Sequence, residues 1–520
     1  MIKARFLLFM CCIIASYSFA QHPNIRIDNP ETVSSPNEPS IMINPQNTDQ
    51  MMAGSNLKYY YVSEDGGYTW ESNTLTSAEN GVWGDPCIIT DTTGAFYFMH
   101  LSNPASGNWI DRIVCQRTDD LGESWPVDTF TGLNGTKAQD KEWAVVDRSN
   151  NHIYMTWTQF DDYGSSASAD SSIIRFSKTT DGGESWSEAK RINKIAGNCI
   201  DSDSTVEGAV PAVGPEGQIY VAWSGPEGIV FDKSYDQGET WLENDIPVDP
   251  HPTGWNYDVP GISRANGLPV TVCDTSGGPH NGTIYINWSD QRNGDNDTDV
   301  WLVKSTDEGE TWSDPIRVND DPPGKHQFFT WMTIDQTNGK LYFIFYDRRN
   351  HDGITTDVYM AVSEDGGETI TNFQVSENPF DPVSSVFFGD YTNVSAHSDI
   401  VRPIWAAYEN GMKLYTAIVD PLAVSIEKPF KPSAITKTFP NPFTDQLNLR
   451  LVMPNPGNIS VDLYSVAGQK IGTLINNQSY PSGKYPVMLP VNRFNLPDGV
   501  YYLKIIRDKE VSMKKIVRTN

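Results

Sequence analysis

The stretch Ser305-Thr306-Asp307-Glu308-Gly309-Glu310-Thr311-Trp312 decides the fold, because the chain contains six versions of it. The central aspartates of successive copies are 55, 61, 55, 71 and 58 residues apart. A unit that recurs at this period with variable insertions predicts a repeat architecture. The six copies are Ser63–Trp70, Thr118–Trp125, Thr179–Trp186, Ser234–Trp241, Ser305–Trp312 and Ser363–Ile370.

Each copy lies between two short runs of strand-forming residues, so it is predicted to form a hairpin turn. In such a turn the Asp can accept backbone N–H groups, the Gly supplies a positive φ, and the Ser or Thr hydroxyl adds a local hydrogen bond. The Trp can cover the turn from the side of the sheet. These are the requirements of a turn and not of catalysis, so the central aspartates are expected to be structural: Asp65, Asp120, Asp181, Asp236, Asp307 and Asp365.

The composition favours an all-β protein with more than one domain. The 520 residues include 15 Trp, 23 Tyr and 21 Phe, and long amphipathic helical periods are absent. The formal net charge of -28 excludes a general electrostatic attraction to nucleic acid or to anionic membranes. An anionic ligand would have to be held by a few local arginines.

The N-terminus reads as a secretory signal peptide at residues 1–20. Lys3 and Arg5 precede the apolar run Phe6–Ile14, and Ser18-Phe19-Ala20 has the small residues of a cleavage site. This run is too short for a transmembrane segment. We therefore expect a secreted or cell-surface protein; export through the periplasm and outer membrane is implied by the resemblance of the C-terminal residues that is described below.

Four cysteines remain in the mature chain, at Cys87, Cys115, Cys199 and Cys273. An even number in an oxidising compartment allows one or two disulfides, and buried free thiols are an equal alternative. The spacing does not determine a pairing.

Each repeat can be divided into four short strands, which is the blade of a β-propeller. A seventh unit without the octapeptide follows the last copy, at Tyr391–Ser395, Val401–Ala407 and Met412–Ala417. Its fourth strand is missing, and Asn24–Asp28 resembles the fourth strand of an earlier unit. An N-terminal strand that completes this unit would close the ring and remove open sheet edges. We predict a propeller at residues 21–422, seven-bladed with six blades as the alternative.

The pattern S/T-x-D-x-G-x-S/T-W resembles the Asp-box, or BNR repeat, of the sialidase-like β-propellers. In that family the boxes lie on the face away from the active site. The resemblance therefore implies that the chemistry lies on the opposite face. We refer to the six octapeptides as Asp-boxes below.

A Pro- and Lys-containing linker is predicted at residues 423–436, followed by a second domain at residues 437–520. Val461–Ile471, Asp498–Ile505 and Lys514–Val517 alternate as strands. They resemble the C-terminal sorting domain of the Bacteroidetes type IX secretion system. This resemblance implies a small Ig-like β-sandwich that binds the secretion machinery; an ordinary Ig-like accessory module is the alternative.

The face opposite the boxes carries the starts of the first strands and the ends of the second strands. The first group supplies Glu38, Asp85, Asp140, Lys141, Glu142, Glu207, Asp390 and Tyr391. The second supplies Asp161, Asp162, Asp290, Arg292, Asp347, Arg348, Arg349 and Glu409. A ring of carboxylates with a few arginines suits a polar glycan.

The sialidase resemblance implies roles for some of these residues. Tyr391 would be the nucleophile with Glu207 as its base, and Asp85 would be the acid. Arg292 and Arg348 would hold a substrate carboxylate, with Lys141, Glu142, Asp290 and Asp347 as further substrate-binding residues. The chain departs from the family here: a third arginine is not evident, and Asn37-Glu38-Pro39-Ser40 replaces the expected Phe/Tyr-Arg-Ile-Pro segment. Inter-blade salt bridges are the alternative role for Asp290 with Arg292 and for Asp347 with Arg348.

The loop residues Asp295, Asp297 and Asp299 alternate in a way that can bind calcium. A solvated acidic loop is the alternative, since the glycine and glutamate of an EF-hand are missing. No cofactor is required. The sequence predicts an exo-acting glycoside hydrolase of extracellular acidic glycans. The alternatives are a non-catalytic glycan-binding propeller or adhesin and, less favoured, a polysaccharide lyase that would use His326 and Tyr391.

Overall fold

The computed structural model of the chain describes residues 22–419, 436–453, 456–465, 470–494, 496–507 and 510–519. The predicted signal peptide at 1–20 lies outside these residues, as does the predicted linker apart from residue 436. Within the described residues the secondary structure is strands and one short 3-10 helix.

The first part of the chain forms four-stranded antiparallel sheets in sequence order. Three of them precede residue 192. They are β2–β5 (Ser40–Ile43, Met51–Ser55, Tyr59–Ser63 and Glu71–Thr74), β6–β9 (Cys87–Thr90, Phe96–Leu101, Ile113–Thr118 and Val127–Thr131), and β10–β13 (Ala138–Asp147, His152–Phe160, Ser172–Thr179 and Lys190–Arg191).

Three further sheets follow the same pattern. They are β14–β17 (Glu207–Val213, Ile219–Gly225, Gly228–Ser234 and Ile246–Asp249), β20–β23 (Val270–Cys273, Ile284–Asp290, Asp299–Ser305 and Ile316–Arg317), and β24–β27 (Gln327–Asp335, Lys340–Asp347, Asp357–Ser363 and Thr371–Gln374). A small ribbon of β18 (Asn256–Tyr257) and β19 (Ala265–Asn266) is inserted between β17 and β20.

The seventh sheet joins the two ends of this region. Strands β28 (Asn393–His397), β29 (Ile400–Tyr408) and β30 (Met412–Ala417) are completed by β1 (Asn24–Arg26) from the N-terminus. Asn24, Ile25 and Arg26 pair with Ala417, Thr416 and Tyr415. The N-terminal strand thus occupies the place predicted for it.

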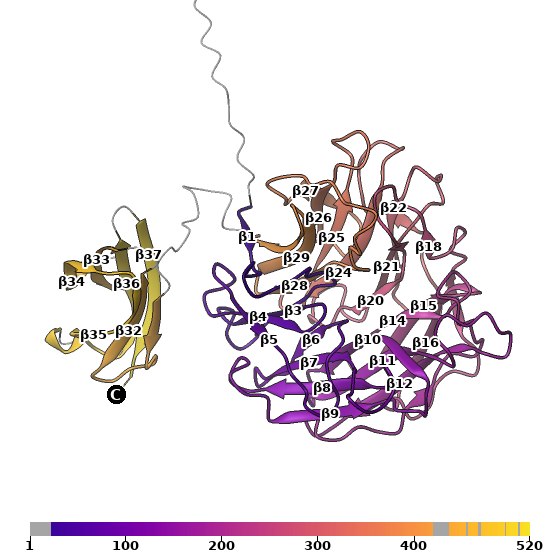
Figure 1. Cartoon of the computed structure of the whole chain (residues 1–520), viewed down its shortest axis with the longest axis horizontal. Coiled ribbons are helices and arrows are strands. Elements are labelled where there is room, and N and C mark those ends of the chain that lie inside the picture. The colour runs from indigo at the N-terminus through magenta and orange to yellow at the C-terminus, as the bar shows by residue number, and fades with distance from the viewer. Residues whose placement is uncertain are drawn as a thin grey trace, which may run out of the picture.

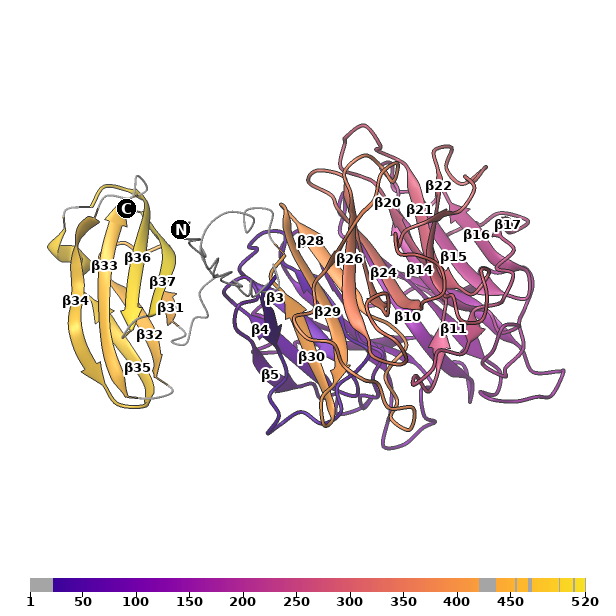
Figure 2. The same cartoon turned by 90° about the horizontal axis from the view of Figure 1, so that it is seen from above.

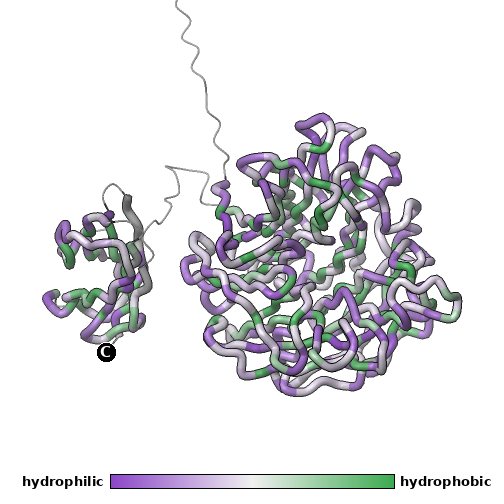
Figure 3. The backbone as a smooth tube through the Cα atoms, viewed as in Figure 1, coloured by the Kyte–Doolittle hydropathy of each residue, from purple (hydrophilic) through white to green (hydrophobic). Residues whose placement is uncertain are grey.

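The innermost strands contact one another in a closed ring: β2, β6, β10, β14, β20, β24, β28 and again β2. Figure 1 shows β6, β10, β14, β20, β24 and β28 around the centre and β9, β12, β16 and β27 toward the periphery. The fold is therefore an all-β propeller of seven four-stranded sheets among the described residues. Apolar residues are concentrated inside the ring and hydrophilic ones in the outer loops (Figure 3).

The Asp-boxes connect the third and fourth strands of six sheets. In the first box, Asp65 accepts the Thr69 N–H (2.9 Å), the Thr69 hydroxyl (2.7 Å) and the Ser63 hydroxyl (3.0 Å). The Ser63 Oγ in turn accepts the Gly67 N–H at 2.9 Å. The other five boxes repeat these bonds. Each box therefore satisfies its own aspartate and its first Ser or Thr hydroxyl.

Side chains of neighbouring sheets also bind the backbone of all six box turns. Four bonds come from cationic side chains, one from a tyrosine and one from a threonine. These donor–carbonyl pairs are Arg402 Nε with Gly66 (2.8 Å), Tyr60 OH with Gly122 (2.8 Å), Thr129 Oγ1 with Gly183 (2.5 Å), Lys178 Nζ with Gln237 (2.9 Å), Lys233 Nζ with Glu308 (2.8 Å) and Lys304 Nζ with Gly366 (3.0 Å). The boxes thus also link adjacent sheets.

The C-terminal unit is a β-sandwich. One sheet contains β31 (Thr436–Phe439), β32 (Leu447–Met453) and β35 (Gly483–Leu489); the other contains β34 (Lys470–Tyr480), β33 (Gly457–Ser465), β36 (Gly499–Arg507) and β37 (Glu510–Arg518). Figure 2 shows the two sheets of this unit. Buried Leu449, Leu451, Val461, Leu463 and Leu503 belong to one core. The described residues include no helix that is long and apolar enough to cross a membrane.

Candidate active site

The site lies at the starts of the innermost strands. Successive strands of each sheet run antiparallel, so the start of the first strand and the end of the third lie on opposite faces. The site is therefore on the face opposite the Asp-boxes, as the sequence predicts.

Several first-strand starts have a left-handed backbone. The φ angles are 49° at Glu38, 51° at Asp85, 55° at Lys141 and 51° at Phe329. Irregular register in β10 between Asp140 and Trp143 marks a bulge at this level, and β14 and β24 have similar irregularities. Non-glycine residues in this conformation cost about 1–3 kcal/mol each, and such strain concentrates at binding and catalytic sites.

Lys141 is the cation at the centre of the site. It is 7% exposed, and its Nζ contacts the Asp390 carboxylate, with Asp85 Oδ2 at 3.5 Å and Glu38 Oε1 at 3.8 Å. Burial would lower the pKa of the Lys141 ammonium, but Asp390, Asp85 and Glu38 outweigh burial and raise it well above its usual value. Lys141 is therefore charged, and it links its own sheet to carboxylates that precede the first strands of three other sheets.

Arg264 is the second cation, and it comes from the β18–β19 insertion. Its Nε donates to Asp390 Oδ1 at 2.9 Å, and its Nη1 donates to Asp201 Oδ2 at 2.8 Å. Tyr163 also donates its hydroxyl to Asp201, at 2.8 Å. Burial alone would raise the pKa of Asp390, but Arg264 and Lys141 hold it below its usual range. Asp390 is thus a permanently ionised anchor for both cations.

These groups border a cavity of about 570 Å³. Glu38, Asp85, Asp140 and Lys141 form its polar side, and Arg264 lines it as well. Its apolar side includes Trp83, Trp109, Tyr163 and Phe387. Rings in this wall meet edge to face: Trp109 lies 5.9 Å from Trp83 and 5.9 Å from Tyr163 between ring centroids.

Two aromatic rings of this wall are open to solvent. Trp109 is 46% exposed and Phe387 is 43% exposed. Exposed aromatic faces beside buried carboxylates are suited to a ligand with both apolar and hydroxyl-bearing surfaces.

Asp140 has a pKa near neutrality. It is 8% exposed, and burial together with the charge of Asp85 raises its pKa to about 7. The backbone N–H of Lys141 donates to Asp140 Oδ1 at 2.9 Å. Two neighbouring carboxyl groups, Asp140 and Asp85, thus repel each other's charge beside one cavity.

Glu142 and Glu207 are fully buried next to the site. Neither side-chain oxygen of either residue has a hydrogen-bond partner within the described residues. Burial raises the pKa of both well above the usual value, with Asp85 adding to the effect on Glu142 and Asp201 to that on Glu207. Burial thus favours the protonated form of both acids, and neither lines the cavity.

Of the remaining residues predicted for the first-strand group, Tyr391 lies beneath the cavity. Its ring packs against Trp143 (5.2 Å) and Trp331 (6.1 Å between centroids). It borders a smaller space of about 30 Å³ together with Lys141 and Asp390. The structure thus brings Asp85 and Lys141 together in the cavity but leaves Tyr391 and Glu207 outside its lining.

The predicted second-strand residues also lie outside that lining. Arg292 binds Asp290 (2.6 Å) and Asp249 of the preceding sheet (2.7 Å), and it stacks on Trp301 at 4.7 Å. This pairing is an inter-sheet salt bridge, the alternative considered from the sequence.

The second predicted pair, Asp347 with Arg348, does not form an ion pair. Asp347 binds Arg349 at 2.8 Å and not Arg348. Arg348 is 1% exposed, donates from Nε to Thr356 Oγ1 at 3.0 Å, and stacks on Phe328. His326 contacts Thr298 Oγ1 through its Nδ1 at 2.9 Å.

The acidic loop after Arg292 is held by protein groups. Asp297 accepts the Gly324 N–H at 2.7 Å, Asp299 accepts Asn319 Nδ2 at 2.6 Å, and Asp295 is exposed. Across the described ranges no group of three or more His, Cys, Asp or Glu residues is placed to hold a metal ion. Cys87, Cys115, Cys199 and Cys273 are buried free thiols.

Sequence reasoning missed Arg264, Asp201, Tyr163 and Asn56. Asn56 donates to the Glu38 carboxylate and accepts the Asp85 N–H at 2.8 Å, so it links two acids of the site. One signal was available: the longest spacing between boxes, 71 residues, contains the insertion that carries Arg264. The other three residues lie in loops whose sequence has no comparable mark.

Comparison with known proteins identifies the C-terminal unit. Residues 437–519 match the family described as the secretion system C-terminal sorting domain. This confirms the prediction from the sequence: the domain directs export through type IX secretion to the cell surface or the extracellular space. No curated protein matches the chain.

The chain is similar in structure to sialidase-like β-propeller proteins, at low identity. A protein of unknown function from Dyadobacter fermentans has 11% identity, with 76% of this chain and 97% of that chain covered and a TM-score of 0.43. The NanB sialidase of Streptococcus pneumoniae has 9% identity, 72% and 84% coverage and a TM-score of 0.43. An alpha-L-arabinofuranosidase of Fusarium graminearum has 13% identity, 69% and 99% coverage and a TM-score of 0.42. These similarities are remote, so the chemistry must come from this chain's own residues.

Proposed function

We propose that the exported propeller is a glycoside hydrolase that acts on an extracellular glycan in the cavity between Asp85, Asp140 and the aromatic wall. The observation that carries this proposal is the pair of adjacent carboxyl groups in one aromatic-walled cavity. Glycoside hydrolysis uses two carboxyl groups in different protonation states on either side of the scissile bond.

The environment of the two carboxyl groups supports different roles. Asp140, with its pKa raised to about 7, is partly protonated at neutral pH, and the protonated form can donate to the leaving oxygen. Asp85 has the Lys141 ammonium 3.5 Å from its Oδ2, so a positive charge lies beside it. In this proposal Asp85 is the carboxylate that activates water or attacks the anomeric carbon, in place of the acid role that the sialidase resemblance implied.

The charged residues of the cavity indicate whether a neutral or an acidic substrate fits it. Lys141 and Arg264 are already engaged by carboxylates, so neither is available to bind an acidic sugar without losing a partner. Lys58 at the cavity edge is exposed and has no ion-pair partner within the described part of the chain. A neutral sugar ring against Trp109 fits this arrangement, and the acidic glycan predicted from the sequence would have to place its anionic group at Lys58.

Sugar release from a panel of neutral, sialylated and uronate-containing glycans tests the proposal. We expect product from at least one member with the parent protein and a loss of product with Asp85→Asn and with Asp140→Asn. The matched control is Asp307→Asn on the Asp-box face. Product release that is unaffected by both site variants would contradict the assignment.

A non-catalytic glycan-binding propeller is the second candidate. It is favoured by the observation that Lys141 already joins three carboxylates, an arrangement that also serves rigidity. Under this alternative no glycan of the panel is cleaved, and a glycan that binds the parent is retained less by Trp109→Ala. The two candidates therefore differ in product formation and share the cavity.

A further inference from the structure

A second cavity, of about 630 Å³, lies along the axis of the propeller. All seven innermost strands contribute to its lining, and so do the turns at the box-face ends of β10, β14 and β24. It is therefore a central channel that reaches toward the box face, away from the carboxylate cavity. Its function does not depend on the proposed hydrolase activity.

The channel wall is mainly apolar. The half-buried lining side chains within the strands are apolar apart from Thr333: Met42, Ala144, Val145, Val213, Val272 and Ala396. Two half-buried polar residues, Gln336 and His397, lie at or beyond the ends of the lining strands. Apolar surface that is open to water inside a cavity gains free energy when a ligand covers it. A cavity of this volume with an apolar wall along the strands and polar groups toward one end suits a small amphiphile.

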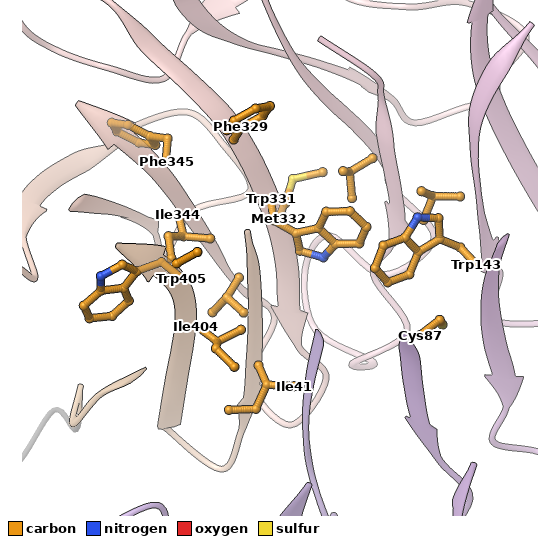
Figure 4. Close-up of a cluster of buried hydrophobic side chains, with 14 of the residues drawn as sticks. Ile41, Cys87, Trp143, Phe329, Trp331, Met332, Ile344, Phe345, Ile404 and Trp405 are labelled. Carbon is orange, nitrogen blue, oxygen red and sulfur yellow. The ribbon is translucent and has the colours of Figure 1, made fainter. Parts of the chain in front are cut away.

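Aromatic rings close the end of the channel nearer the carboxylate cavity. Trp143 and Trp331 line the channel and pack with their centroids 4.2 Å apart, and Tyr391 packs against both on the far side. Figure 4 shows the Trp143 and Trp331 rings side by side. The channel is therefore a blind pocket with its bottom at these two tryptophans.

The mouth carries a cation. Arg148 follows β10 and lines the channel, and its side chain is exposed although protein around the channel surrounds it. Burial lowers the pKa of the Arg148 guanidinium, and the Asp335 carboxylate acts against this. Arg148 forms no hydrogen bond or ion pair with another described residue. The neighbouring Asp147 does not neutralise it by a direct contact, because the Asp147 oxygens accept from Ser149 (2.6 Å) and Asn150 (2.8 Å). A guanidinium fork at the entrance can bind a carboxylate through two hydrogen bonds.

We propose that this channel binds an amphiphilic carboxylate, with its acyl chain between the innermost strands and its headgroup at Arg148. Burial of the chain is favoured in proportion to the apolar area removed from water. The charge of Arg148 sets the orientation of the ligand, with the chain end at Trp143 and Trp331.

Calorimetry with decanoate, and with decanol as the uncharged probe, tests this site on the full chain. We expect saturable binding of one decanoate per chain and a change in tryptophan fluorescence, because Trp143 and Trp331 form the bottom of the pocket. Arg148→Gln should weaken decanoate binding by about tenfold to a hundredfold, the range for a lost charge-assisted hydrogen bond. The same substitution should leave decanol binding unchanged.

Two further variants distinguish binding in the channel from nonspecific attraction to positive charge and from binding elsewhere on the protein. Arg117→Gln removes the same charge elsewhere on the box face, at the end of β8, and should leave decanoate binding unchanged. Ala396→Phe fills the channel and should abolish binding of both probes. Absence of saturable decanoate binding would overturn the proposal. Unchanged decanoate binding in Ala396→Phe would show that the channel is not the site. Unchanged decanoate binding in Arg148→Gln would show that Arg148 does not bind the headgroup.

Discussion

Acidic side chains on the two faces of the propeller differ in their hydrogen bonding. At the Asp-box end, the carboxylates of Asp65 and its five counterparts each accept hydrogen bonds from residues of their own box. At the other end, Glu142 and Glu207 are buried without partners, and Asp140 is partly protonated near neutrality. Carboxylates with local hydrogen-bond partners thus occur where the role is structural. Buried carboxyl groups without partners, or with raised pKa values, occur at the candidate active site.

The difference follows from how far apart the interacting residues are in the sequence. A box satisfies its aspartate within four residues. Lys141 meets Asp390 across 249 residues, and Arg264 meets the same carboxylate across 126. When distant parts of the chain bring several carboxylates together, each one shifts the pKa of the others. Each box aspartate is instead bound by residues of its own box.

The largest expected effect is on activity. Asp140→Asn should lower kcat on a cleaved glycan by about 10²–10⁴-fold, because a general acid is lost. Activity of the parent should fall as pH rises through about 7, the value to which burial and Asp85 raise the pKa of Asp140. Asp307→Asn should retain both kcat and the pH profile. A parent-like rate for Asp140→Asn below pH 7 would show that Asp140 is not the acid.

Lys141→Met should cause the largest loss of stability. It leaves the Asp390, Asp85 and Glu38 carboxylates with one cation fewer in a buried site, and removal of one partner from such an arrangement costs about 3–5 kcal/mol. Urea unfolding followed by tryptophan fluorescence reports on the propeller alone, because residues 437–520 contain no Trp. A change below about 1 kcal/mol would mean that the cluster is effectively solvent-screened.

Asp307→Ala should lower the stability of the propeller by a smaller amount. It removes the bonds from Thr311 N–H (3.0 Å), the Thr311 hydroxyl (2.6 Å) and the Ser305 hydroxyl (2.7 Å) at an exposed turn. We expect a loss of about 1–2 kcal/mol in the same unfolding assay. Glycan binding and cleavage should be unaffected, and impaired function in a folded variant would contradict a purely structural box.

Glu207→Gln should have the smallest effect, visible in the pH dependence of stability. Burial raises the pKa of Glu207 well above 4.5, so the unfolded chain releases this proton at a lower pH than the folded protein does. The folded state therefore loses stability as pH rises above 4.5, and the neutral Gln removes that loss. The stability gain of the variant should be greater at about pH 8 than at about pH 5. An equal effect at both values would show that Glu207 does not retain its proton.

Much of the fold could be predicted because its signals are local. The six boxes mark six hairpins, and the similarity of Asn24–Asp28 to a fourth strand predicted the pairing of β1 with β30. The face of the site followed from strand direction. The roles of Arg292 and Arg348 could not be read in this way: both end second strands, yet one forms an inter-sheet ion pair and the other is buried beside Phe328.

The sequence by itself determined the repeat, the export signal of the C-terminal domain and the face on which to search, because each is written in contiguous residues. The tertiary structure alone decided which carboxylates share the cavity with Lys141, that Arg264 reaches Asp390 from an insertion, and that the channel wall is apolar. The physical reason is closure of the ring. It brings together residues from seven sheets at burial depths where each charge depends on the others, and no local pattern encodes that dependence.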